Sequence, residues 1–126
     1  MKNLLFIIFL APALMAQDAS LNKISQAIGN GDAQTLAQYF DETVEVAILD
    51  NEDMYDKAEA QRVVAGFFSK HDLKSYNQVH QGVSKKEDSQ YSIGKLVAAN
   101  GTFRVYVYMK IDNGRHIIQE LRFDKE

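Results

Sequence analysis

Apolar and polar residues alternate along several stretches of the chain, a period of two that is typical of β-strands with one buried face. The alternation is unbroken over residues 103–110, which read FRVYVYMK. Other stretches rich in β-formers are bounded by turn residues. We predict strands at residues 43–49, 74–83, 91–99, 102–111 and 116–123.

Three further segments carry helical signals. Apolar residues recur every three to four positions over residues 20–28, and the sequence GNG at 29–31 ends that helix. Asp32 is placed to cap a second, short helix. Asp56 and Glu59 have the spacing of a capping box, which predicts the start of a third helix.

The order of these elements indicates the fold class. Two or three N-terminal helices followed by a run of strands predict an α+β domain, with the helices packed on one face of a curved, mostly antiparallel sheet of about five strands. The chain has 126 residues and no internal repeat, linker or low-complexity tract. We therefore expect one domain, at residues 17–126.

Two turn sequences predict how the last strands pair. The pair NG at 100–101 is a strong signal for a two-residue turn in which both residues have positive φ. The sequence DNG at 112–114 closes either with two residues, which mixes apolar and polar faces, or with three and a left-handed Gly114. We favour the three-residue loop, which sets Arg104 opposite Arg122.

The predicted sheet is occupied on both faces. The apolar face, which we assign to the helices, consists of Leu96, Phe103, Val105, Val107, Met109, Leu121 and Phe123. The opposite face, here called the outer face, mixes aromatic, aliphatic and charged side chains: Tyr91, Ile93, Lys95, Val97, Arg104, Tyr106, Tyr108, Ile118, Glu120 and Arg122. Contiguous exposed apolar area of this kind usually marks a contact surface.

We predict that the outer face packs on a second copy of the chain, because Tyr and Arg are enriched in interface hot spots and two-fold self-packing is the commonest assembly. The predicted interface residues are Tyr91, Arg104, Tyr106, Tyr108, Glu120 and Arg122. The alternatives are that this face lines a pocket or is simply solvated. An Arg104–Arg122 pair needs a negative neighbour, either Glu120 or a bound carboxylate or phosphate.

The first residues have the pattern of an export signal. Lys2 gives a positive start, an apolar run follows over residues 4–13, and small Ala16 precedes polar Gln17. The run is shorter than the roughly 20 residues that span a bilayer. We predict a signal peptide at residues 1–16, cleaved after Ala16, and a periplasmic or secreted protein; a buried N-terminal helix is the alternative.

Composition narrows the classes of function. The net charge is −3 and no basic cluster occurs, which argues against a nucleic-acid partner. The chain has no cysteine, so disulfides, thiol chemistry and a lipidated cysteine as a stable membrane anchor are excluded. His71, His80 and His116 fall on separate predicted elements, so we expect no metal site, and no cofactor is predicted.

The layout of helices and strands resembles the nuclear-transport-factor-2-like superfamily, a cystatin-like α+β cone whose usual opening looks like IGNGD at 28–32. More narrowly, the chain resembles a family of exported bacteroidete proteins, domain-of-unknown-function family 4783, over nearly all of residues 19–124. The segments that carry this resemblance are AQ at 60–61, FF at 67–68, HQG at 80–82, YSIG at 91–94, FRVY at 103–106 and IQELR at 118–122.

The resemblance implies a cone-shaped space between the third helix and the sheet, and ligand-binding residues lining it. Those residues would be Tyr39, Phe68, Tyr76 and His80, in contact with a small apolar or anionic ligand. Some members of the superfamily are isomerases, dehydratases or hydrolases, but Ala47 stands where an isomerase-like base aspartate belongs. His80 is the remaining candidate catalytic residue, although a lone imidazole is more often structural.

We therefore expect an exported, non-catalytic module that binds a small molecule or a protein and homodimerises through its sheet. An isomerase- or dehydratase-like enzyme that uses His80 in the cone is the alternative.

Overall fold

The computed structural model describes residues 12–126, with side chains described from Ser20 onward. Helices α1 (Pro12–Asn30), α2 (Ala33–Ala37) and α3 (Lys57–Ser69) are present in this part of the chain. The strands are β1 (Phe40–Ile48), β2 (Asn51–Asp56), β3 (Leu73–Val83), β4 (Ser89–Ala98), β5 (Gly101–Asp112) and β6 (Arg115–Lys125). Residues 1–11 of the predicted signal peptide lie outside the described residues, and α1 continues through its last five positions.

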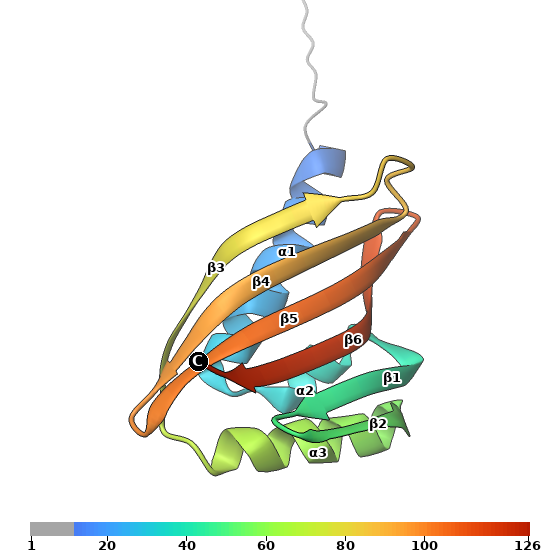
Figure 1. Cartoon of the computed structure of the whole chain (residues 1–126). Helices are drawn as coiled ribbons and strands as arrows, with labels where there is room; N and C mark the ends of the chain where they lie inside the picture. The colour runs from blue at the N-terminus through green and yellow to red at the C-terminus, as the bar shows by residue number, and fades with distance from the viewer. Residues whose placement is uncertain (1–11) are drawn as a thin grey trace, which may run out of the picture.

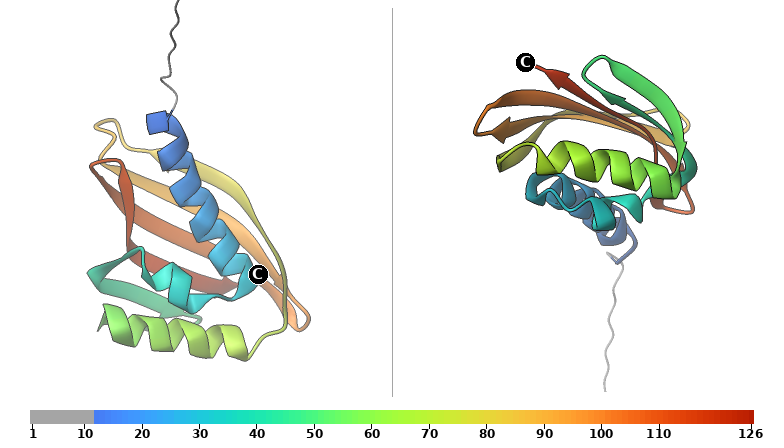
Figure 2. Two further views of the ribbon diagram at one scale, coloured as in Figure 1. Left: turned by 180° about the vertical axis from the view of Figure 1, so that it is seen from behind. Right: turned by 90° about the horizontal axis from the view of Figure 1, so that it is seen from below.

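The six strands form one curved sheet in the order β2-β1-β6-β5-β4-β3 (Figure 1). Every pairing is antiparallel except that of β1 with β6, so the sheet is mixed. Figure 2 shows the helices together on one side of the sheet. The predicted α+β fold is confirmed, with six strands rather than about five.

The additional strand is β2. Its residues Asn51–Asp56 are mostly polar, and no strand was predicted between residue 49 and the helix cap at Asp56. Leu49 has a φ of 56°, and this left-handed residue turns the chain back so that β2 pairs with β1 along the sheet edge. A polar sequence is suited to such an edge because it discourages pairing with other chains.

Side-chain caps begin the helices where the sequence predicts. The Asp56 carboxylate accepts from the Glu59 amide at 2.8 Å at the start of α3, and Asp32 accepts from the Thr35 amide at 3.0 Å at the start of α2. Gly31 ends α1 with a φ of 66°, a conformation that costs glycine little.

The core lies between the helices and the concave face of the sheet. All seven residues assigned to the apolar face are buried. Phe67 and Phe68 of α3 reach across to the sheet, where the Phe67 ring lies 4.5 Å from the ring of Phe123 and 5.2 Å from that of Phe103. These aromatic rings fill the space between α3 and strands β5 and β6.

The β5–β6 turn differs from the prediction. Asp112 pairs with Arg115, so the loop has the two residues Asn113 and Gly114, both with positive φ. The expected mixing of faces is avoided because a β-bulge at Gln119 inserts one extra residue into β6. Beyond the bulge, apolar positions again face the core.

The bulge also moves two predicted positions. Ile118 lies in the core with no exposed surface, not on the outer face. Arg104 pairs with Asp124 and Arg122 pairs with Tyr106, so the predicted Arg104–Arg122 pair is wrong.

The β4–β5 turn is shifted by one position from the expected one. Ala98 pairs with Gly101, so Ala99 and Asn100 form the turn, and Gly101 takes a φ of 147°. Asn100 does not have the predicted positive φ. The shift changes each cross-strand partner by two residues, and so the faces of both strands stay as predicted.

Candidate interaction surface and binding cleft

The outer face of the sheet carries a row of stacked rings. The Tyr91 and Tyr106 rings are 6.2 Å apart at 17°, and the Tyr91 hydroxyl lies 2.7 Å from Nε2 of His80. Both tyrosines are half-buried, and His80 is exposed. Since no helix covers this face (Figure 2), the row presents aromatic surface held in a defined geometry.

A shallow depression of about 390 Å³ lies beside this row. Four of the six predicted interface residues line it, together with Ile93 and Asp124: Arg104, Tyr106, Glu120 and Arg122. The structure therefore brings these four residues together. Tyr91 and Tyr108 pair with each other across β4 and β5, on the same face, next to the pair of Ile93 and Tyr106.

Carboxylates crowd the β2-β1-β6 side of the outer face. Arg122 Nη1 lies 3.4 Å from Glu120 and 3.7 Å from Glu52. A hydrogen bond with Glu52, burial and the charge of Glu120 raise the pKa of Glu45, and Arg122 only partly opposes this. Burial, followed by the charge of Glu120, also raises the pKa of Tyr106. Three glutamates thus share one arginine, which leaves this side of the face acidic.

Cations occupy the other side. Arg104 and Lys95 are paired strand neighbours on β5 and β4, and both approach Glu126, at 3.8 and 3.7 Å. Each arginine therefore already has a protein carboxylate nearby. Glu120, one of the two predicted negative neighbours, contacts Arg122 but is not paired with Arg104, and the arrangement that suggested a bound anion between two arginines is absent from the described residues.

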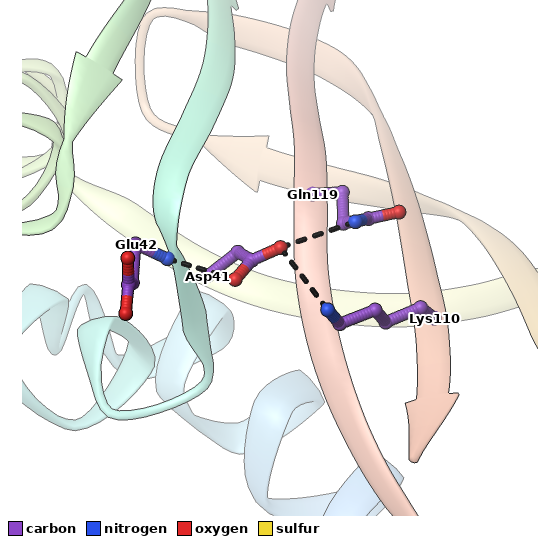
Figure 3. Close-up of polar contacts among 4 residues, drawn as sticks. All are labelled: Asp41, Glu42, Lys110 and Gln119. Carbon is purple, nitrogen blue, oxygen red and sulfur yellow. Dashed lines mark hydrogen bonds and ion pairs between the residues drawn. The ribbon is translucent and has the colours of Figure 1, made fainter.

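The bulge residue Gln119 is fixed by side chains that the sequence did not single out (Figure 3). Gln119 Nε2 donates to Asp41 at 3.1 Å, and Lys110 Nζ lies 3.6 Å from the same carboxylate oxygen. The hydrogen bond from Gln119, followed by that from the Glu42 amide, lowers the pKa of Asp41. This cluster ties β1, β5 and β6 together where the β1–β6 register changes.

The predicted cone residues do not share a pocket. Phe68 is buried in the aromatic core, and Tyr39 is half-buried against it. Tyr76 packs its ring over Gly94, where a Cβ atom would overlap the ring. Burial raises the pKa of Tyr76 to about 12, and the Ser92 side chain works against this shift. These three aromatic residues fill the interior.

His80 lies on the outer face, not in the cone as predicted. Gln78 pairs with Gly94 and His80 with Ile93, so Val79 is an extra residue that reverses the alternation of β3. The contact described for His80 is with Tyr91, and no carboxylate forms an ion pair with it in the described part of the chain. The catalytic arrangement proposed for the cone is therefore not formed.

An open space partly walled by apolar side chains lies elsewhere, between α3 and the β1–β2 hairpin. This space, here called the α3 cleft, has a volume of about 560 Å³. Its apolar wall is formed by Val46, Ile48, Tyr55, Val63 and Phe67. Sequence reasoning missed it because its two sides come from separate segments, residues 46–55 and 62–71, whose approach depends on the unpredicted strand β2.

Comparison with protein families matches residues 21–124 to DUF4783, a domain of unknown function. The chain belongs to the DUF4783 family. A crystal structure of a DUF4783 family protein from Bacteroides uniformis is similar at 32% identity, covering 83% of this chain and 95% of that one with a TM-score of 0.77. One from Bacteroides ovatus is similar at 30% identity, 82% and 93% coverage, and a TM-score of 0.76.

More distant structures share the fold of this DUF4783 chain. An NTF-2 like protein of unknown function from Burkholderia xenovorans is 11% identical, with 90% and 87% coverage and a TM-score of 0.66. A protein with a cystatin-like fold from Nostoc punctiforme is 8% identical, with 95% and 96% coverage and a TM-score of 0.67. No curated protein matches the chain. The resemblance stated from sequence is confirmed for both family and fold.

Across residues 12–126, no group of three or more His, Asp and Glu side chains is arranged to hold a metal ion. None of the helices in that range combines the length and apolar character required to cross a membrane.

Proposed function

We propose that this DUF4783 protein is an interaction module that homodimerises through the outer face of its sheet. The observation that carries the proposal is the uncovered row of Tyr91 and Tyr106 beside a depression lined by charged residues. The ring contact and the hydrogen bond to His80 hold these side chains in place before a partner arrives. Such preorganisation lowers the entropy that association costs.

The charge distribution favours one arrangement of the two copies. Glu45, Glu52 and Glu120 lie on the β2-β1-β6 side, whereas Lys95 and Arg104 lie on β4 and β5. A two-fold axis along the strands reverses the strand order of the partner and brings carboxylates opposite cations. An axis across the strands would bring like charges together, which is unfavourable.

Sedimentation equilibrium over a range of protein concentrations tests the dimer. We expect a monomer–dimer equilibrium, and Tyr106→Glu should raise its dissociation constant at least about tenfold because it places a charge in the centre of the contact. Gln38→Glu adds the same charge to an exposed position at the end of α2 and serves as the control. Lys95→Glu should weaken the dimer less, and the loss should shrink with added salt.

A chain that stays monomeric at all concentrations would overturn the proposal. Equal effects of Tyr106→Glu and Gln38→Glu would show that the copies associate through another surface. An unchanged dissociation constant in Lys95→Glu at low salt would count against the axis along the strands only.

We further propose that the protein is exported. The support is the N-terminal pattern of a positive start, an apolar run and a small residue at Ala16. Protein recovered from the periplasm or the medium should begin at or near Gln17 when its N-terminus is sequenced. Recovery of the uncleaved chain from the cytoplasm would contradict export.

A further inference from the structure

The α3 cleft has the dimensions and apolar wall of a ligand site, and it lies on the helix side of the β1–β2 hairpin, apart from the proposed dimer contact. Its volume of about 560 Å³ falls within the range of roughly 300–1,000 Å³ that small-molecule pockets occupy. Val46 and Phe67 at its base are buried, and Ile48, Tyr55 and Val63 are half-buried. An aliphatic chain laid on this wall would remove apolar surface from water.

One rim of the cleft is basic. Arg62 lines it from α3, Lys70 lines it from the C-cap position of that helix, and His71 follows. Arg62 and Lys70 are eight residues apart, so they lie on the same side of the helix with Gly66 midway between them. The pairing of Arg62 with Glu59 spans 3.8 Å with both side chains more than half exposed, so the guanidinium is available to another anion.

Two carboxylates, those of Glu52 and Asp53, line the opposite rim on β2. The Asp53 carboxylate accepts from the Met54 amide of its own strand at 2.8 Å. Glu52 lines the cleft but directs its carboxylate to Arg122 of the outer face, at 3.7 Å. The two signs of charge therefore lie on opposite rims, with Arg62 and Lys70 on the α3 side and the carboxylates on the hairpin side.

Gly66 has no evident role in the fold. It lies in the interior of α3, where glycine costs about 1 kcal/mol relative to alanine. Its φ is not positive, and a Cβ atom added there would meet nothing within 4 Å. What the glycine does is leave the helix wall of the cleft bare between the two cations, so that a ligand can approach the backbone closely.

From these features we infer that the α3 cleft binds an amphiphilic anion. The aliphatic part lies on the wall formed by Val46, Val63 and Phe67, and a single carboxylate or phosphate head lies over Gly66 between Arg62 and Lys70. The phenol of Tyr55 is available as a further donor to the head group.

Titration of the isotopically labelled protein with decanoate, decyl phosphate and decanol, followed by backbone amide NMR, tests this assignment. Decanoate or decyl phosphate should shift the amides of Tyr55, Val63 and Gly66 in a saturable way, and decanol should bind at least about fivefold more weakly. Which of the two anions binds more tightly identifies the head group. Equal binding of decanol and both anions would overturn the inference, as would shifts confined to the outer face.

A matched pair of variants locates the site. Gly66→Leu fills the cleft and should reduce the affinity for the better anion at least about tenfold. Ala65→Leu adds the same side chain to the next position of α3, which faces a different groove, and should leave the affinity unchanged. Unchanged affinity in Gly66→Leu, with both variants shown folded by their NMR spectra, would refute the site.

The charge requirement is tested separately. The Arg62→Gln, Lys70→Gln double variant should lose about fivefold or more in affinity for the anion and little for decanol. An equal loss for both probes would mean that the two cations do not hold the head group.

Discussion

Tyr76 offers a direct test of how the interior is filled. Its hydroxyl is buried and lacks a hydrogen bond of acceptable geometry within the described part of the chain, although Ser92 lies close enough to influence its pKa. A buried polar group left without a partner costs about 1–3 kcal/mol. With Ser92 nearby we take the lower end, so Tyr76→Phe should stabilise the protein by about 1 kcal/mol at pH 7.

The same residue predicts a dependence on alkaline pH. The folded-state pKa of Tyr76 is about 12, above the ordinary value of 10.0, so folding favours the protonated phenol. The free energy of unfolding is therefore unaffected by this group below pH 10 and falls as the pH rises through 12. At pH 11 the loss is about 1.4 kcal/mol. Tyr76→Phe cannot ionise there, and its advantage over the unmodified protein should grow to about 2.4 kcal/mol at pH 11.

Urea unfolding at pH 7 and pH 11 measures both values as free energies of unfolding. Other groups that titrate between these pH values do so in both proteins, and therefore the difference isolates Tyr76. Tyr39→Phe, at a half-buried phenol, is the control and should change stability by less than about 0.5 kcal/mol. A loss of 1 kcal/mol or more in Tyr76→Phe at pH 7 would show that the hydroxyl is hydrogen-bonded, and the reasoning would be wrong.

Two further predictions concern contacts that hold the sheet. Gly94→Ala should destabilise the protein by about 1–3 kcal/mol in urea unfolding, because the new Cβ overlaps the Tyr76 ring. Adding Tyr76→Leu should recover part of this loss. A Gly94→Ala variant as stable as the unmodified protein would contradict this packing. Asp41→Asn should cost about 1 kcal/mol at pH 7 by weakening its contacts with Gln119 and Lys110. Because the pKa of Asp41 is lowered in the folded protein, this cost should disappear in acid unfolding as the pH falls below about 4. A cost that persists at that pH would exclude the charge of Asp41 as its cause.

Local patterns were sufficient for most of the architecture. The caps at Asp32 and Asp56 depend on residues three positions away, and the faces of β4, β5 and most of β6 follow from a period of two. These signals lie within one element, so they can be recognised before the chain is folded. The family resemblance was also readable from sequence, since it depends on the same packing and turn residues.

The errors have a common physical origin. A single bulge residue, Val79 or Gln119, reverses which side chains face the core beyond it, and neither residue carries a distinctive signal of its own. At Gln119 the bulge is supported by a hydrogen bond to Asp41 of β1, a strand that is far away in sequence and adjacent in the sheet. Ile118 was therefore placed on the wrong face by a period of two continued across the bulge, and His80, placed in the cone on the family resemblance, is turned outward by the bulge at Val79.

What the sequence determined by itself was the α+β class, the helix boundaries set by caps, and an apolar face paired with an aromatic, charged one. The tertiary structure alone decided the register of β6, the outward position of His80, and the α3 cleft with Gly66 between two cations. Periodicity and capping act over a few neighbouring residues, whereas bulges and clefts depend on which distant strand or helix comes to lie beside a segment.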